Sequence, residues 1–248
     1  MTESRTGRPL RSLGVAAVAV SLFIVQSLSG KLENLVAGSF SYCTIDPDNA
    51  FAWQSVHHLV MLAVALAIIA VLGSLLKVDF GLCAGVRKAG VRYLAIFTSA
   101  FAGFALVTHI IMLLGGRLPA YDFPLNTRNI LGTLGFQLFL SGPAEELLYR
   151  ALPISLLLYA SGSKAKPGST VTPEIIIASI LFALAHIKWS LSPFTVSLDY
   201  MQLLYAMGMG VIQGVAYQKS RSVLYPILIH SLSNLIMVGM GYLFILLA

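Results

Sequence analysis

The sequence predicts an all-α membrane protein, a polytopic transmembrane helical bundle of seven to eight spans. Hydrophobic residues make up 57% of the 248-residue chain and charged residues only 10%, whereas soluble domains carry about 25% charged residues. Several apolar runs also reach the ~20 residues that a helix needs to cross a bilayer. These runs are continuous rather than alternating, which excludes a transmembrane β-barrel.

Seven apolar stretches are the expected spans. The fourth is long enough for two helical pieces, which leaves eight spans open. We find no internal repeat, soluble domain or low-complexity tail, so residues 1–248 are expected to form a single integral membrane domain. The stretches are 12–30, 53–76, 91–116, 130–160, 173–190, 201–220 and 223–247.

The first stretch follows Arg8 and Arg11 and therefore resembles a signal peptide. Its apolar part is near the upper length limit for such a segment, and the small-x-small alanine cleavage pattern is missing, so we expect a retained helix. Cys43 and Cys83 are predicted on opposite sides of the membrane and lack metal-site spacing, so they should neither pair nor bind a metal.

Basic residues orient the chain through the positive-inside rule. The rule places the N-terminus in the cytoplasm and, with seven spans, the C-terminus outside. The net charge of +6 reflects this bias. Because no basic stripe is interleaved with aromatic residues, nucleic-acid binding is not expected. The short chain and loops suggest a prokaryotic cell membrane. The residues assigned to the inner side are Arg5, Arg8, Arg11, Lys77, Arg87, Lys88, Arg92, Lys164, Lys166, Lys219 and Arg221.

The fourth stretch contains two adjacent glutamates and an arginine. Inserting each charged side chain at the bilayer centre costs at least ~2.5–3.5 kcal/mol, so we expect these residues to have a functional or structural role. Pro143 should kink or restart the helix. Glu146 and Arg150 are four residues apart and share a face, while Glu145 is rotated by about 100°. In one interpretation Arg150 neutralises Glu146 while Glu145 faces a cavity; in the other, the two form a structural ion pair and Glu145 is a spare, solvated acid near a helix end.

Two further polar pairs have the same four-residue spacing. Phe182 and His186 share a face of the fifth stretch, and His230 and Asn234 share a face of the last. By themselves both pairs favour a structural role over a functional one: packing for His186, and interhelical hydrogen bonding, a common use of His and Asn in membranes, for His230 and Asn234. His57 and His58 open the second stretch and are expected at the membrane interface.

The three patterns occur in order: Glu-Glu-x-x-x-Arg at 145–150, Phe-x-x-x-His at 182–186 and His-x-x-x-Asn at 230–234. This order resembles the CPBP family, the CaaX-processing and bacteriocin-processing intramembrane endopeptidases, also called the type II CaaX prenyl endopeptidase or Abi family. The resemblance covers about residues 130–240, the expected catalytic core. It implies a glutamic-type intramembrane protease.

The resemblance also implies roles for individual residues. Glu145 would be the general base that activates a water molecule, and His186 would share that water. His230 and Asn234 would donate hydrogen bonds to the oxyanion of the tetrahedral intermediate. These parts meet the needs of peptide hydrolysis, which are a nucleophilic water, a base and donors to the oxyanion.

The supporting residues implied by the resemblance are Glu146, Arg150 and Phe182. The first two would orient and neutralise charge around the base, and Phe182 would pack beside the water site. Nothing in the sequence supports a covalent nucleophile, because neither cysteine lies near the motifs and no serine is paired with Lys or His in a recognised pattern.

No metal or other cofactor is expected. The alternative is zinc held by Glu145, His186 and His230, a ligand set that zinc accepts, although this reading leaves Asn234 without a role. Two non-enzymatic alternatives are a membrane scaffold and a transporter. A transporter would favour repeated halves with matched broken helices, and no such symmetry is found.

The expected partners are membrane lipids and a membrane-associated peptide or protein substrate, with or without a prenyl group. The resemblance implies substrates of three kinds: CaaX-type C-termini, leader peptides and protein sorting tails. The motifs do not choose among them.

Overall fold

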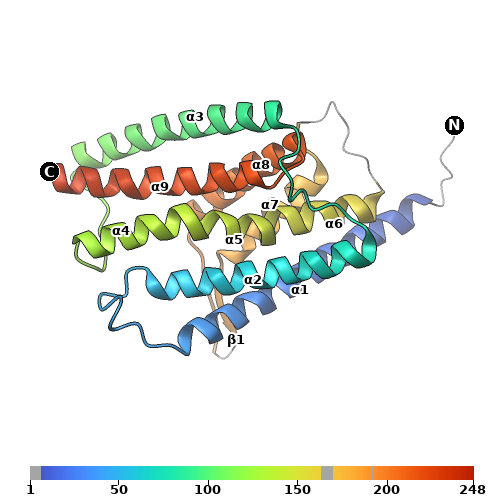
Figure 1. The fold of residues 1–248 in the computed structure, drawn as a ribbon, viewed down its shortest axis with the longest axis horizontal. Helices are drawn as coiled ribbons and strands as arrows, with labels where there is room; N and C mark the ends of the chain where they lie inside the picture. The colour runs from blue at the N-terminus through green and yellow to red at the C-terminus, as the bar shows by residue number, and fades with distance from the viewer. Residues whose placement is uncertain (1–6, 163–169, 192) are drawn as a thin grey trace.

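A continuous helical rod lies in the middle of the computed structural model (Figure 1). It corresponds to the fourth predicted span and is slightly longer than that span. Its successive parts are α4 (Thr127–Phe136), the π-helical segment η1 (Gln137–Ser141), α5 (Gly142–Glu146), a second π-helical segment η2 (Leu147–Ala151) and α6 (Leu152–Ser161).

Prolines explain the two wide π turns of the rod. Pro143 stands in the first turn of α5 and Pro153 in the first turn of α6, each directly after a π-helical segment. Because proline has no N–H and its ring clashes with the carbonyl four residues back, a widened turn accommodates it without ending the helix. The predicted kink or restart at Pro143 is thus a change of helical pitch in an unbroken rod. Such π turns are frequent at functional sites.

The other elements surround this rod, and the structure describes residues 7–162, 170–191 and 193–248. They are α1 (Gly7–Gly38), α2 (Ala52–Leu76), α3 (Arg87–Leu114), α7 (Pro173–Ala185), β1 (Lys188–Leu191), β2 (Phe194–Ser197), α8 (Tyr200–Ser220) and α9 (Leu224–Leu247).

The surrounding helices pack in pairs on either side of the rod. On one side α1 packs against α2 and α6; on the other, α3 packs along α9, and α7 along α8 (Figure 1). The N-terminus lies at the end of the bundle opposite the C-terminus. Arg5, Lys164 and Lys166, on which the orientation partly depends, lie outside the described residues, and the N-in orientation stays a prediction.

Four helices in the described part of the chain are long and apolar enough to cross a membrane: α1 from Ser12 onward, α2, α3 and α9. They expose large apolar side chains such as Leu66 and Phe104, as lipid-facing helices do. The helical membrane bundle is therefore confirmed, whereas the number of seven to eight spans stays a prediction.

The fifth predicted span, 173–190, extends beyond the helix that the structure contains. Its helix, α7, ends at Ala185 and has 13 residues, which is about 20 Å at 1.5 Å per residue and short of a ~30 Å hydrocarbon core. The chain then forms an antiparallel hairpin in which Lys188 pairs with Ser197 and Leu191 with Phe194. The all-α prediction therefore missed one small two-stranded element, because apolar composition alone does not distinguish a short strand from a helix end.

The start of α2 is fixed by a carboxylate in the preceding loop. Asp46 accepts hydrogen bonds from the backbone N–H groups of Ala50, Phe51 and Ala52 at 2.7–2.9 Å. Burial alone would raise the pKa of Asp46, but these three bonds outweigh it and hold the pKa below its usual value. The anchored first turn sets the position of the polar residues that follow on α2.

Candidate active site

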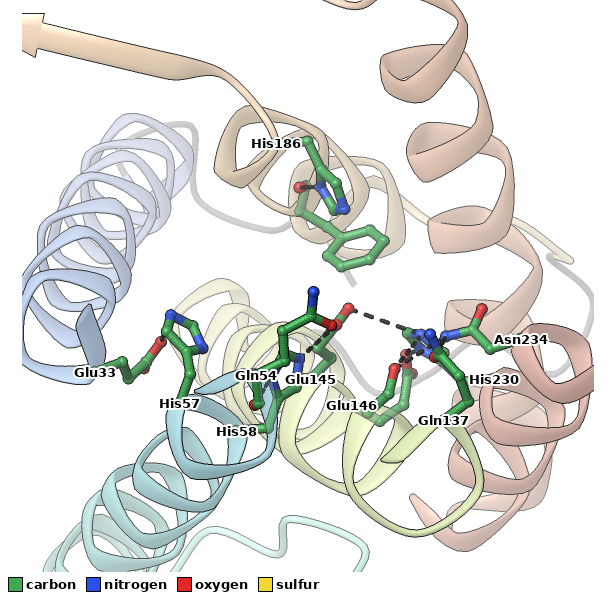
Figure 2. Close-up of polar contacts among 12 residues, drawn as sticks. Glu33, Gln54, His57, His58, Gln137, Glu145, Glu146, His186, His230 and Asn234 are labelled. Carbon is green, nitrogen blue, oxygen red and sulfur yellow. Dashed lines mark hydrogen bonds and ion pairs between the residues drawn. The ribbon is translucent and has the colours of Figure 1, made fainter. Parts of the chain in front are cut away.

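A cavity of about 230 Å³ in the interior of the bundle contains the residues that the motifs single out. Glu145 comes from α5, His186 from the end of α7, and His230 and Asn234 from α9. Figure 2 shows Glu145 near His230 and Asn234, with His186 above them on another helix. The expected convergence of the four residues is thus observed, while their catalytic roles stay predictions.

Glu145 lies between two imidazole rings. Its Oε1 is 3.1 Å from His58 Nε2, and its Oε2 is 3.7 Å from His230 Nε2 (Figure 2). The first separation is a hydrogen bond, whereas the second is slightly too long for one. One carboxylate oxygen is therefore engaged and the other faces the cavity with an imidazole beside it.

Glu146 orients His230. Its Oε1 accepts a hydrogen bond of 2.7 Å from His230 Nδ1–H, and the Glu146 side chain is completely buried. This bond turns His230 Nε2 toward Glu145, with the Ser141 hydroxyl 3.5 Å away. The sequence predicted that Glu146 pairs with Arg150 alone, so its contact with His230 is an addition that links α5 to α9.

Arg150 is fully buried and contacts residues of three helices, α5, α7 and α8. Its Nε is 3.4 Å from Glu146 Oε2, as the four-residue spacing predicted. Its Nη2 donates a short hydrogen bond to Gln213 Oε1 on α8, and its guanidinium lies 3.9 Å from the centre of the Phe182 ring on α7. The cation–π contact is favourable at this distance and places Phe182 beside the site.

Asn234 is held by the central rod. Its Nδ2 donates to Gln137 Oε1 at 3.0 Å and to Ser141 Oγ at 2.9 Å. Both N–H groups of the amide are therefore engaged in this state. An oxyanion contact from Asn234 requires that one of these bonds is exchanged for the substrate.

His186 presents one ring nitrogen to the cavity. Its Nδ1–H donates to the Phe182 carbonyl at 2.9 Å, and the two rings meet edge to face with centres 4.7 Å apart. In the neutral ring this bond leaves a lone pair on Nε2. His186 thus lines the cavity with its Nε2 able to accept a hydrogen bond.

The sequence reasoning missed His58. It was expected at the membrane interface, whereas it lines the cavity and contacts Glu145. A signal for it exists in the sequence, because Gln54 and His58 are four residues apart in an apolar helix and share a face, as the three motif pairs do. Gln54, Gln137, Gln202, Tyr205 and Gln213 also line the cavity and were missed.

No group of three or more His, Cys, Asp or Glu residues suited to a metal ion occurs in the described segments. Cys43 and Cys83 are free and exposed.

Gly142 allows α5 to approach α9 closely. A Cβ atom there would lie 2.3 Å from Ser231 Oγ and 2.8 Å from the Ile227 carbonyl oxygen. Gly142→Ala is therefore expected to force the helices apart, at a cost of roughly 1–3 kcal/mol in stability, and to reduce turnover by separating Glu145 from His230.

Gly135→Ala is the matched control, because a Cβ there meets nothing within 4 Å on the same rod. Thermal unfolding in detergent should show a lower Tm for Gly142→Ala and an unchanged or slightly higher one for Gly135→Ala, since alanine favours a helix by roughly 0.5–1 kcal/mol. Equal melting temperatures for the two variants would contradict the close-approach argument.

Fold and site together define a helical membrane protein with an acid–imidazole cavity among its helices. Residues 127–236 match the family model described as type II CAAX prenyl endopeptidase, Rce1-like. This match places the segment in the CPBP family of intramembrane proteases and confirms the resemblance seen in the motifs. The family implies a membrane protease of the CAAX type in its general class. No curated protein and no solved structure matched the chain.

Proposed function

We propose that the protein is a glutamic-type intramembrane endopeptidase in which Glu145 activates a water molecule. The observation that carries this proposal is the position of Glu145: its Oε1 is bonded to His58 while Oε2 faces a cavity lined by His186 and His230. A general base must reach its water within ~2.6–3.2 Å, and a water next to Oε2 meets this requirement.

The proposed reaction needs only water and the peptide. Glu145 takes one proton from the water as its oxygen attacks the scissile carbonyl carbon. The carbonyl oxygen becomes an oxyanion, which His230 and Asn234 stabilise by hydrogen bonds. Collapse of the intermediate breaks the C–N bond, and Glu145 returns the proton to the leaving nitrogen. The products are a new carboxylic acid and a new amine.

The support for donation by His230 is its orientation. Because Nδ1–H donates to Glu146, donation from Nε2 requires the doubly protonated ring, and the carboxylates of Glu145 and Glu146 both lie beside this ring. The proposed role of His186 is to accept a hydrogen bond from the same water through Nε2.

The proposed substrates are membrane-associated peptides or proteins of the CaaX, leader-peptide or sorting-tail kind. The purified protein in lipid nanodiscs should be given three peptides: a farnesylated peptide ending in a CaaX sequence, the same peptide without the farnesyl group, and a transmembrane sorting-tail peptide. We expect mass spectrometry to detect a new C-terminus in at least one of them. Failure to cleave any peptide, over a range of lipids, would contradict the proposal.

We further propose that hydrolysis requires no metal. Activity on the cleaved peptide should survive exhaustive treatment with EDTA or phenanthroline, and the purified protein should carry no stoichiometric zinc. Under the zinc alternative, chelation abolishes activity, added zinc restores it, and His230 becomes a ligand. Stoichiometric zinc together with zinc-restored activity would refute the metal-free mechanism.

A further inference from the structure

A histidine outside the family-matched segment contacts the proposed base. His58 belongs to α2, whereas the match covers 127–236. We propose that His58 is a positioning residue, which fixes the Glu145 carboxylate through Oε1 and thereby presents Oε2 to the catalytic water. This inference rests on the proposed function, and its test includes a readout that does not depend on turnover.

The His58 ring is held in one orientation. Its Nδ1–H donates to the Gln54 carbonyl at 2.9 Å, one turn back on α2. The Phe136 ring packs edge to face against the His58 ring, at an angle of 84° and with the ring centres 4.8 Å apart. Only 14% of the His58 side chain is exposed. The ring therefore has little freedom to turn Nε2 away from Glu145.

The two contacts of the His58 ring constrain which of its nitrogens can donate. With Nδ1–H donating to a carbonyl, a neutral His58 has a lone pair on Nε2, and an ionised carboxylate has only acceptors. Two acceptors 3.1 Å apart repel each other unless a proton lies between them. The hydrogen bond to Glu145 therefore needs a proton between His58 Nε2 and Glu145 Oε1, in which the nitrogen donates and the carboxylate accepts.

This bond gives the two carboxylate oxygens of Glu145 different roles. Oε1 is hydrogen-bonded to His58, whereas Oε2 is 3.7 Å from His230 Nε2, too far for a direct hydrogen bond, and borders the cavity. One oxygen of the carboxylate is thus bonded to α2, and the other borders the cavity. Without His58, the plane of the carboxylate is free to rotate, and misplacement by about 1 Å can cost ~10²-fold in rate.

The neighbouring histidine provides a matched control. His57 is adjacent on α2 but faces α1, where its Nε2 is 3.5 Å from Glu33 Oε2. It does not line the catalytic cavity described above. Figure 2 shows His57 directed toward Glu33 and His58 toward Glu145. Substitution of His57 perturbs the same turn of α2 without touching the base.

The kinetic test compares His58→Ala, His58→Gln and His57→Gln on the peptide that the wild-type protein cleaves. We expect His58→Ala to lower kcat by roughly 10–10²-fold with little change in KM. His58→Gln should recover most of this loss, because its amide N–H can donate to Glu145 Oε1. His57→Gln should keep wild-type kcat. Wild-type kcat in His58→Ala, equal losses in His58→Ala and His58→Gln, or an equal loss in His57→Gln would overturn the proposal.

Infrared difference spectroscopy tests the contact itself. The carboxylate stretch that disappears in Glu145→Gln identifies the Glu145 band. This band should shift in His58→Ala and stay in place in His57→Gln. An unshifted band in His58→Ala would overturn the positioning role even in a protein that cleaves no peptide. Conversely, a shifted band in an inactive wild-type protein would retain the contact and reject the proposed function.

Discussion

Replacing Glu145 with glutamine is expected to reduce peptide cleavage by roughly 10²–10⁴-fold, the usual loss when a general base is removed. Glutamine has nearly the same shape but cannot accept the proton of the water. The variant should fold normally, because Glu145 borders a cavity and does not form the fully buried pair with Arg150. Initial rates on the cleaved peptide in nanodiscs, together with Tm in detergent, measure both effects.

Glu145→Asp serves as the matched variant. It keeps the carboxylate but withdraws it by one methylene, so we expect an intermediate rate. A Glu145→Gln protein with near wild-type turnover would end the assignment of this residue as the base. A large fall in Tm with the loss of activity would instead point to a structural role.

Breaking the buried pair should have the largest effect on stability. Glu146 and Arg150 have no exposed surface, and removing one partner of such a pair typically costs about 3–5 kcal/mol, because it leaves the other charge buried without its partner. We therefore expect Glu146→Gln and Arg150→Met each to lower Tm strongly and to reduce expression.

The double variant Glu146→Gln/Arg150→Met controls for this reasoning. Because the double variant leaves neither charge of the pair unpaired, it should lose less stability than the sum of the stability losses of the two single variants. Glu146→Gln should also reduce turnover, since the bond that orients His230 loses its negatively charged acceptor and is weakened. Single variants that retain the wild-type Tm, or purely additive losses, would contradict the structural role of the pair.

The helical periodicity of the sequence was sufficient to predict which of these side chains share a helix face. Four-residue spacing placed Glu146 on the same face as Arg150, and it placed Glu145 on another face. The structure has both features, and it brings His186 and the His230–Asn234 pair to the same cavity. Motif order and helical geometry are local properties, which explains why the sequence reveals them.

Contacts between distant helices could not be predicted in the same way. His58 is 87 residues from Glu145 and Gln213 is 63 residues from Arg150, and no periodicity relates them. The two π turns around α5 were also missed, because Pro143 predicts a disturbed helix without saying how the helix absorbs it. The hairpin after α7 follows an apolar run whose length did not reveal where the helix ends.

The most direct test of the central claim is a single turnover in H₂¹⁸O with enzyme in excess over peptide. If Glu145 activates a water that itself attacks the scissile carbonyl, mass spectrometry should find ¹⁸O in the new C-terminal carboxylate of the product. The enzyme peptide that contains Glu145 should remain unlabelled. Label in the Glu145 carboxylate, or a trapped enzyme whose mass has increased by the acyl fragment of the substrate, would contradict direct attack by water.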